Sequence, residues 1–373
     1  MQNQCQDNFS TTFTTYGEMQ LYHEQLAKDS QWQRCKVSYR HVEPLDRKSP
    51  LFSDMSAFAL GTSSGALALA ISVEGQMYPV RGTAYKSLLE RAKISGSVLP
   101  KLSREKLART LNDCLALFSS EALILIRDEK ISAAHSGDPT DYSVLPIDQL
   151  LKALESKLES RFPGAEFETG YRDHALTSAS WTLPAQKEDL LGTYEKMLIA
   201  TGRAKMAAKL VPGIRFLTSD TGVASAKVSA LLMGAQYPIH IGSCVAVDHR
   251  RQTTIADFSD ALDQLFAQFA DSVSQLQRLL EIHLDYPINA MTRVCKKLAL
   301  PKKASVEAIA MYEMAYGGGP ATAHDVFMAL QEIPCILKSS NTPESKMLSV
   351  EENLARALTL RWSDYDLAKA VDY

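Results

Sequence analysis

Histidine, cysteine and aspartate, which are all metal-ligand types, gather in one segment of the chain, from His240 to His249. If this segment is a strand, His240, Cys244 and Asp248 share one of its faces. Same-face positions four residues apart are separated by about 13 Å, at about 3.3 Å per residue. A single ion cannot reach all three without a sharp bend. We therefore predict no metal site here, and expect a core strand that ends in a polar turn.

A second segment with possible chemistry is Ser219-Asp220-Thr221-Gly222, which follows an apolar strand pattern. Asp-Thr-Gly is the triplet of aspartic proteases, in which two such carboxylates share a proton. Only one copy occurs in this chain, so we interpret it as a polar turn.

Motifs for other kinds of catalysis are absent from the sequence. There is no G-x-S-x-G nucleophile elbow and no H-E-x-x-H zinc motif. Catalytic residues are therefore unknown, and the enzyme hypothesis is uncertain, leaning to no. It would require Asp220, Cys244, Asp248 or His249 to converge in one pocket.

Two glycine-rich segments resemble phosphate cradles only superficially. Gly317-Gly318-Gly319-Pro320 lacks the Lys-Ser or Lys-Thr pair of a phosphate loop, and Gly61-Thr62-Ser63-Ser64-Gly65 is explained by a hairpin connection. The six cysteines show no C-x-x-C spacing and are interpreted as reduced core thiols. We predict no cofactor.

Local basic islands are more informative than these motifs. No acidic residue occurs from Lys196 to Ser219 or from Tyr286 to Val306, and Arg250-Arg251 forms a further basic pair. Such islands can contact phosphates, although a solvated face explains them equally well. The candidate nucleic-acid-binding residues are Arg203, Lys205, Lys209, Arg215, Arg250, Arg251, Arg293, Lys296, Lys297, Lys302 and Lys303.

Composition limits the class of protein. The chain has 373 residues, 46% of them hydrophobic, and a formal net charge of −3, which argues against disorder and against coating DNA by bulk positive charge. The first thirty residues lack the apolar core of a secretory signal, and the most apolar stretch, residues 58–73, is too broken to span a bilayer. We expect a cytoplasmic protein with no membrane partner.

The elements expected in the first half are strands with a few helices. Alternation indicates a strand at residues 36–42 and hairpins at 66–80 and 122–135. Helical spacing indicates helices from 83 to 92, from the N-cap Ser103 onward, and after Pro146. Two further strands, at 165–171 and 175–183, complete this part.

Helices dominate the second half. A helical pattern covers residues 186–208, and strands are expected at 213–217, 223–232 and 239–247. A long helix follows Thr254, with Asp257 completing a capping box, and Pro287 is expected to close that segment. Shorter helices are predicted at 305–316, 322–330 and 349–360, the last opening on the Ser349-x-x-Glu352 box.

This order of elements predicts an α+β fold, with a mixed, mainly antiparallel sheet, packed helices and a helix-rich C-terminal region. The predicted divisions are a weakly ordered or exchangeable N-terminal arm (1–35), an α+β domain (36–184), strands and a long helix that continue the core (185–285), and a helical C-terminal region (286–373).

Several segments, taken in order, carry a family resemblance. They are Tyr78-Pro79-Val80, Leu88-Leu89, Asn112, Leu125-Ile126-Arg127, residues 131–136, Leu145-Pro146-Ile147-Asp148, residues 213–222, and Cys244 before His249. Over about residues 36–285 the chain resembles the phage/plasmid-like proteins of unknown function, whose genes are commonly carried by mobile elements near replication or recombination genes. That family has no agreed activity, so the resemblance implies a context and no site residues.

The leading hypothesis is therefore a mobile-element accessory protein that binds DNA or RNA in replication or recombination, as a homo-oligomer. The alternative is a counter-defence or regulatory factor that binds a host protein. Nucleic-acid affinity over a salt series separates the two.

Overall fold

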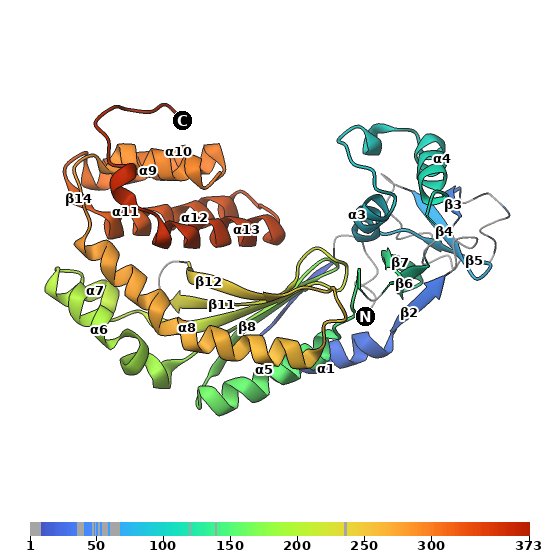
Figure 1. The fold of residues 1–373 in the computed structure, drawn as a ribbon, viewed down its shortest axis with the longest axis horizontal. Helices are drawn as coiled ribbons and strands as arrows, with labels where there is room; N and C mark the ends of the chain where they lie inside the picture. Colours follow the sequence, from blue (N-terminus) through green and yellow to red (C-terminus); the bar gives the residue numbers. More distant parts are fainter. Residues whose placement is uncertain are drawn as a thin grey trace.

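The computed structural model describes residues 9–35, 41–46, 48, 50, 53, 59, 68–118, 121–138, 140–234 and 237–373. Buried apolar side chains form two large clusters, one in a small lobe and one in a large lobe, which lie side by side along the longest axis (Figure 1). The described strands pair antiparallel, and helices pack against their sheets. The predicted α+β class is confirmed.

The small lobe contains two three-stranded sheets, ordered β2-β6-β7 and β3-β4-β5. Helix α3 packs on β7 and α4 on β3. Ser103 caps α4, because its hydroxyl accepts the amide of Lys106. Both predicted hairpins and both predicted helices of this region are confirmed. The elements are β2 (Ser30–Cys35), β3 (Val42–Pro44), β4 (Leu69–Val73), β5 (Gln76–Pro79), α3 (Gly82–Arg91), α4 (Arg104–Leu115), β6 (Ala122–Arg127) and β7 (Lys130–Ser136).

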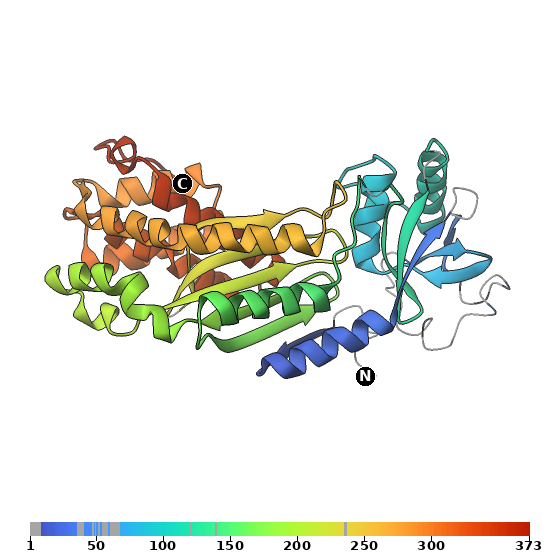
Figure 2. The same cartoon turned by 60° about the horizontal axis from the view of Figure 1, so that its bottom comes forward.

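The large lobe is built on a six-stranded antiparallel sheet, ordered β1-β8-β9-β10-β11-β12. Figure 2 shows α8, α5 and α1 lying next to one another across one face of it. These elements are β1 (Ser10–Phe13), α1 (Tyr16–Lys28), α5 (Ile147–Arg161), β8 (Glu166–Asp173), β9 (Thr177–Thr182), α6 (Lys187–Ala200), α7 (Ala204–Ala207), β10 (Val211–Thr218), β11 (Ala226–Met233), β12 (Ile239–Val247) and α8 (Ile255–Glu281).

Strand β10 shows how both faces of this sheet are covered. Successive side chains of a strand point to opposite faces. Phe216 meets Phe258 of α8 with ring centroids 5.8 Å apart. Its neighbour Leu217 packs in a separate cluster with Leu348 of helix α13 (Glu344–Ala355), on the other face. The sheet is therefore the middle layer between α8 and the C-terminal helices.

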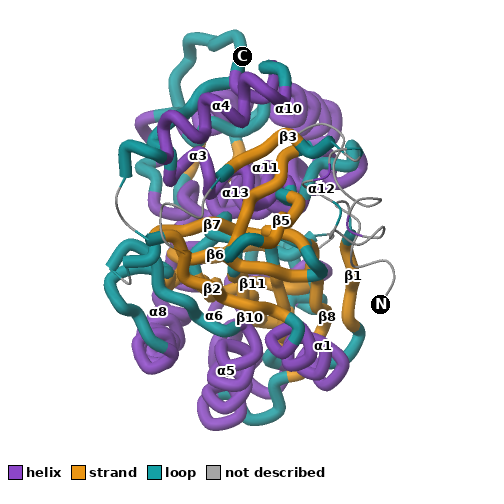
Figure 3. Tube along the Cα trace, turned by 90° about the vertical axis from the view of Figure 1, so that its right-hand side faces the viewer, coloured by secondary structure: helices purple, strands orange, loops and turns teal. Residues whose placement is uncertain are grey.

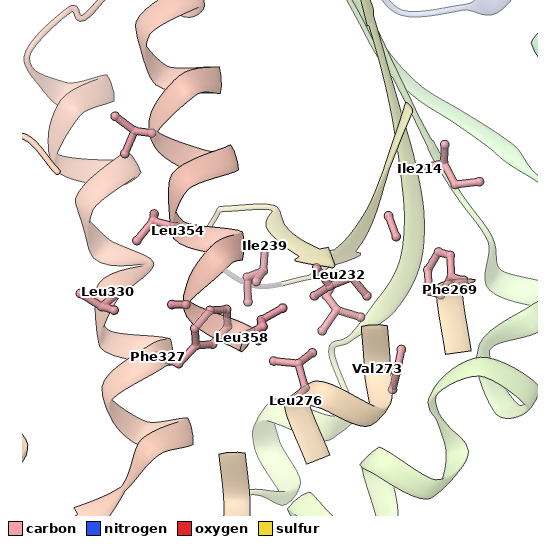
Figure 4. Packing of buried hydrophobic residues seen from close by; sticks show 14 of the residues in the cluster. Ile214, Leu232, Ile239, Phe269, Val273, Leu276, Phe327, Leu330, Leu354 and Leu358 are labelled. Carbon is pink, nitrogen blue, oxygen red and sulfur yellow. The ribbon is translucent and has the colours of Figure 1, made fainter. Parts of the chain in front are cut away.

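The helix-rich C-terminal region predicted from the sequence is confirmed. Figure 4 shows Phe327 and Leu330 packed with Leu276 of α8 and with Leu354 and Leu358 further along the chain. No helix in the described part of the chain has the length and apolarity needed to cross a membrane. The remaining elements are β13 (His283–Leu284), α9 (Pro287–Lys297), α10 (Lys302–Tyr316), β14 (Ala321–Thr322), α11 (Ala323–Leu330) and α12 (Glu332–Ser339).

The N-terminal segment differs from the expectation of a weakly ordered arm. Strand β1 pairs with β8 of the large sheet, α1 packs on α5, and β2 pairs with β6 in the small lobe. Residues 9–35 thus connect the lobes, and the connecting segment between β7 and α5, described from residue 140 to 146, joins them a second time. Figure 3 views the molecule from the small-lobe end, with β2, β6 and β7 in front of the strands of the larger sheet.

Other local predictions need correction. Pro287 starts α9 rather than closing a segment, because proline suits the first helical turn. Ser349 lies inside α13, whose N-cap is Pro343, so the Ser-x-x-Glu box there is coincidental. The helix expected at 186–208 is broken at Gly202, which has a φ of +81°.

One sheet and its hydrophobic core continue across the domain boundary predicted at residue 184. Strands β9 and β10, which flank the division at 184, are neighbours in the large sheet. Most of the strand expected at 36–42 and the whole loop 61–65 lie outside the described residues.

Candidate functional site

The two lobes meet at a cleft of about 720 Å³, which we call the junction cleft. Side chains from both lobes line it. The small lobe contributes Ser87, Glu90, Arg91, Lys93, Phe118, Ala134, His135 and Ser136, and the connecting segment and large lobe contribute Asp141, Tyr142, Gly222, Ala224, Ser225, Asp248, His249 and Arg250.

Four stacked rings cross the junction beside this cleft. His135 of β7 and Tyr142 of the connecting segment have ring centroids 3.6 Å apart and an interplanar angle of 6°. Tyr142 is also parallel to His249, at 5.5 Å, and Trp32 of β2 lies 6.1 Å from His135. This aromatic stack therefore joins the small lobe to the turn that follows β12.

The histidines of the stack are neutral near pH 7. Burial lowers the pKa of His135 to about 4 and also lowers the pKa of His249. Burial, followed by the charge of Asp220, raises the pKa of the Tyr142 hydroxyl. The stack thus supplies uncharged rings, and its stability does not depend on an ionised imidazole.

Beneath the stack lies a junction ion cluster formed by Arg127, Asp220 and Arg172. Oδ2 of Asp220 lies 2.6 Å from Arg127 and 3.7 Å from Arg172. Burial alone would raise the pKa of Asp220, but the two guanidinium groups more than offset this and hold it well below its usual range. Arg127 comes from the small lobe and Arg172 from the large one, so this carboxylate ties the lobes together.

The turn that carries Asp220 is shaped to fit the stack. The backbone carbonyl of Asp220 accepts a hydrogen bond from the Tyr142 hydroxyl at 3.1 Å. Gly222 has a φ of +78°, and a Cβ atom there would lie 2.9 Å from the His135 ring. The Ser219 hydroxyl accepts the amides of Thr221 and Val223, which closes the turn. The predicted polar turn is therefore present, and its aspartate has a structural task.

A second ion pair, with a buried arginine, lies at the same junction. Arg81 contacts Asp128 at 2.8 Å and donates a hydrogen bond to Nε2 of His174 at 2.8 Å. Arg81 and Asp128 belong to the small lobe, whereas His174 follows β8 of the large lobe. The junction is thus held by two networks of charged hydrogen bonds.

Only some of the four residues considered for catalysis, Asp220, Cys244, Asp248 and His249, lie together at the junction. Asp220 and His249 both contact Tyr142, and Asp248 lines the junction cleft with Ser225. Cys244 lies on β12, half-buried, where burial and the charge of Glu352 raise the pKa of its thiol. A protease-type dyad needs a second carboxylate at Asp220, whereas this carboxylate faces two arginines.

The histidine and aspartate side chains at positions 240 and 248, considered above as metal ligands, also lie apart. His240 lies 3.0 Å from Glu351 of α13, whereas Asp248 lies beyond the end of β12 in the turn. Among the residues that the structure describes, no three histidine, cysteine or carboxylate side chains are grouped to hold a metal ion.

Several of the predicted basic residues bind other parts of the chain. Arg203 pairs with Asp325 at 2.6 Å, and Arg215 pairs with the buried Glu351. Arg293 donates to the Lys369 carbonyl, and Lys296 donates to the Asp372 carbonyl. Arg215 in particular is occupied in an ion pair beneath α13 and is not available to a phosphate.

The other predicted cations are exposed, at separate places in the fold. Lys205 and Lys209 lie in and after α7, and Lys297, Lys302 and Lys303 lie where α9 ends and α10 begins. Arg250 and Arg251 occupy the turn after β12, and Arg250 lines the junction cleft. Of these three places, the turn after β12 is the one that borders the cleft.

Sequence reasoning singled out Asp220 and His249 among the junction residues, but not the arginines and rings that contact them. Arg127 ends an otherwise apolar strand, and a charged residue inside such a run is a signal of a buried ion pair. Tyr142, His135 and Arg172 carried no comparable signal, because their partners are distant in sequence.

Comparisons with known proteins yield no match: no family model, curated protein or solved structure is similar to this chain.

Proposed function

We propose that this protein is a phage or plasmid accessory protein that binds nucleic acid, with a single strand seated in the junction cleft. The observation that carries the proposal is that exposed cations from both lobes face one cleft: Lys93 from the small lobe and Arg250 from the large lobe. Arg251, the next residue along the chain, is exposed as well. Such groups attract phosphates without reading sequence.

The other lining groups suit the same ligand. Glu90, Asp141 and Asp248 equal in number the cations Arg91, Lys93 and Arg250, so the formal charges of the lining cancel. Carboxylates can accept hydrogen bonds from base amino groups, whereas cations contact the backbone. Small residues, Gly222, Ala224 and Ser225, leave room for close approach of a strand.

Salt-dependent binding of a labelled oligothymidine strand tests this proposal. We expect the triple variant K93A/R250A/R251A to bind at least about tenfold more weakly, which corresponds to about 1.4 kcal/mol. The slope of log affinity against log salt should fall by about 0.7 for each phosphate that the variant no longer neutralises.

The matched control removes three exposed cations elsewhere, in K205A/K209A/K297A, with melting curves to verify that both variants fold. We expect this control to bind nearly as the wild type does. The proposal is overturned if the wild type shows no binding at low salt, or if the control binds as weakly as the cleft variant.

A second candidate function, binding of a host protein, is favoured by the outer face of α10. Met314 and Tyr316 are 85% and 75% exposed, and Val306 and Met311 are also exposed. Exposed methionines suit adaptable protein contacts. A pull-down from host lysate, in which M314E abolishes capture of a host protein and the cleft variant does not, would support this function. Capture that M314E leaves unchanged would exclude this face as the contact.

A further inference from the structure

A second cavity, of about 140 Å³, lies at the junction and shares Tyr142 with the cleft. We call it the α1 cavity, because α1 contributes His23, Leu26 and Ala27 to its wall. A single water molecule needs only about 10–15 Å³ by the same kind of measure. The α1 cavity therefore has room for a small organic group. Its other lining residues are Ser30, Trp32, Arg127, Tyr142, Val144, Leu145, Pro146, Ile147, Asp148 and Asp220.

Three polar atoms of this lining have no hydrogen-bond partner among the described residues: Nε2 of His23, Oδ1 of Asp148 and Oδ1 of Asp220. His23 and Asp220 are 2% and 8% exposed, so bulk water does not cover them. An unsatisfied buried polar group costs about 1–3 kcal/mol, and more when it is charged. The cavity thus presents polar groups that an occupant would satisfy.

The chemistry of these atoms limits the occupant. Carboxylate oxygens only accept hydrogen bonds, so the occupant must donate. Burial and the nearby charge of Arg172 lower the pKa of His23 well below 6.5, so its ring is neutral and has one donor and one acceptor nitrogen. A ligand with adjacent donors and acceptors satisfies such a set.

Charge excludes ionic occupants. The carboxylates of Asp148 and Asp220 balance the guanidinium groups of Arg127 and Arg172, so an anion meets no net positive charge here. A cation beside Asp220 would face the guanidinium groups of Arg127 and Arg172, which already neutralise that carboxylate. The best occupant is therefore neutral, and it carries N–H donors.

The remaining walls are apolar and aromatic. Leu26, Pro146 and Ile147 provide aliphatic surface, and Trp32 and Tyr142 provide aromatic surface. A ring with an apolar body and a polar edge is suited to this combination. We propose that the α1 cavity binds a nucleobase, with His23, Asp148 and Asp220 receiving its N–H edge. This inference deepens the proposed nucleic-acid function, and the base can come from a free nucleoside or from an unpaired position of a bound strand.

Calorimetric titration of the full chain with guanosine, and separately with uridine, tests the site. Guanosine carries both a ring N–H and an amino group, so we expect it to bind at least about tenfold more tightly than uridine. Ala27 is exposed at the edge of the cavity, so the variant Ala27→Phe should block its opening and abolish nucleoside binding without changing a charge. The same change at a likewise exposed helical alanine that does not line the cavity, Ala267→Phe, should leave binding unchanged.

Asp148→Asn provides a second variant that retains volume, and it should weaken guanosine binding about tenfold. The cleft variant K93A/R250A/R251A should retain nucleoside binding, which separates failure of this site from failure of the cleft. A strand with one abasic position identifies the source of the base. If the wild type binds the abasic strand more weakly than the intact strand, and Ala27→Phe binds both strands equally, then the base in the cavity comes from the strand. Absence of nucleoside binding together with equal affinity for the abasic and intact strands overturns the proposal.

Discussion

Among the described residues, two buried carboxylates, those of Glu351 and Asp220, are paired with arginine, but they connect different parts of the molecule. Glu351 of α13 contacts Arg215 and His240, which lie on neighbouring parts of one sheet face, so its pair holds a helix on its own lobe. Asp220 contacts Arg127 from one lobe and Arg172 from the other. The first arrangement stabilises a layer of the large lobe, whereas the second sets how the two lobes meet around the cleft and the α1 cavity.

The difference in partners has an energetic consequence. Burial would raise the pKa of both carboxyls, yet their arginine partners lower it, to about 2 for Glu351 and well below the usual range for Asp220. Both groups are therefore ionised at neutral pH. Removing Glu351 leaves one guanidinium without a carboxylate, whereas removing Asp220 leaves two.

The largest effect is expected for Asp220→Asn. Breaking a buried ion pair costs about 3–5 kcal/mol, and the loss of a carboxylate shared by two arginines places this variant near the upper end, at about 5 kcal/mol. Urea unfolding measures this change. Asp141→Asn, an exposed change at the same cleft, should stay within about 0.5 kcal/mol of the wild type. A cost below about 1 kcal/mol for Asp220→Asn would show that the junction ion cluster does not hold the lobes.

A smaller effect is expected for Glu351→Gln, at about 3 kcal/mol, because a single arginine is left unpaired in a partly accessible position. The double variant R215L/E351L should recover much of the loss, since apolar residues can replace a buried pair at little cost. A double variant less stable than Glu351→Gln alone would indicate that the ion pair has a further task on this sheet face.

The pH dependence is expected to report the aromatic stack. The pKa of His135 falls from about 6.5 to about 4 on burial, so the unfolded chain takes up its proton first as the pH falls. Stability is therefore lost between these two values. His135→Phe, which keeps a ring in the stack, should reduce the slope there by about 1.4 kcal/mol per pH unit. Unfolding curves across this window measure it, and an unchanged slope would contradict the burial of His135 at the junction.

The smallest effect is expected for Glu352→Gln. Glu352 follows Glu351 directly and pairs with Lys227 at 2.9 Å, but both side chains are about one quarter exposed. Solvent screens such a pair, so we expect a loss below about 1 kcal/mol that shrinks further in high salt. A loss equal to that of Glu351→Gln would mean that burial is not what distinguishes these neighbours.

Local signals predicted much of the fold. Alternation and turn residues identified the hairpin of β6 and β7, and Ser103 and the Thr254–Asp257 capping box marked the starts of α4 and α8 correctly. These features depend on residues close in sequence, which is why a single chain reveals them. The same kind of signal failed at Ser349, where a three-residue pattern lies inside a helix that begins at Pro343.

The candidate site was mostly hidden from such reasoning. The basic islands were visible as composition, but Arg215 and Arg203 proved to be partners of Glu351 and Asp325, more than 100 positions away in the chain. The residues that build the junction come from segments that are far apart in the chain. Without the tertiary structure, nothing relates Trp32 and Arg127 to Tyr142, Asp220 and His249.

The sequence by itself determined the α+β class, because apolar periodicity and capping are properties of neighbouring residues. It also determined which charges exist, but not where they act. Only the tertiary structure decided that Asp220 is a tie between two lobes, that three histidines are buried and neutral at their junction, and that unpartnered polar atoms border a cavity there. The physical reason is that burial and long-range pairing set the energy of a charge, and both arise only when distant segments pack.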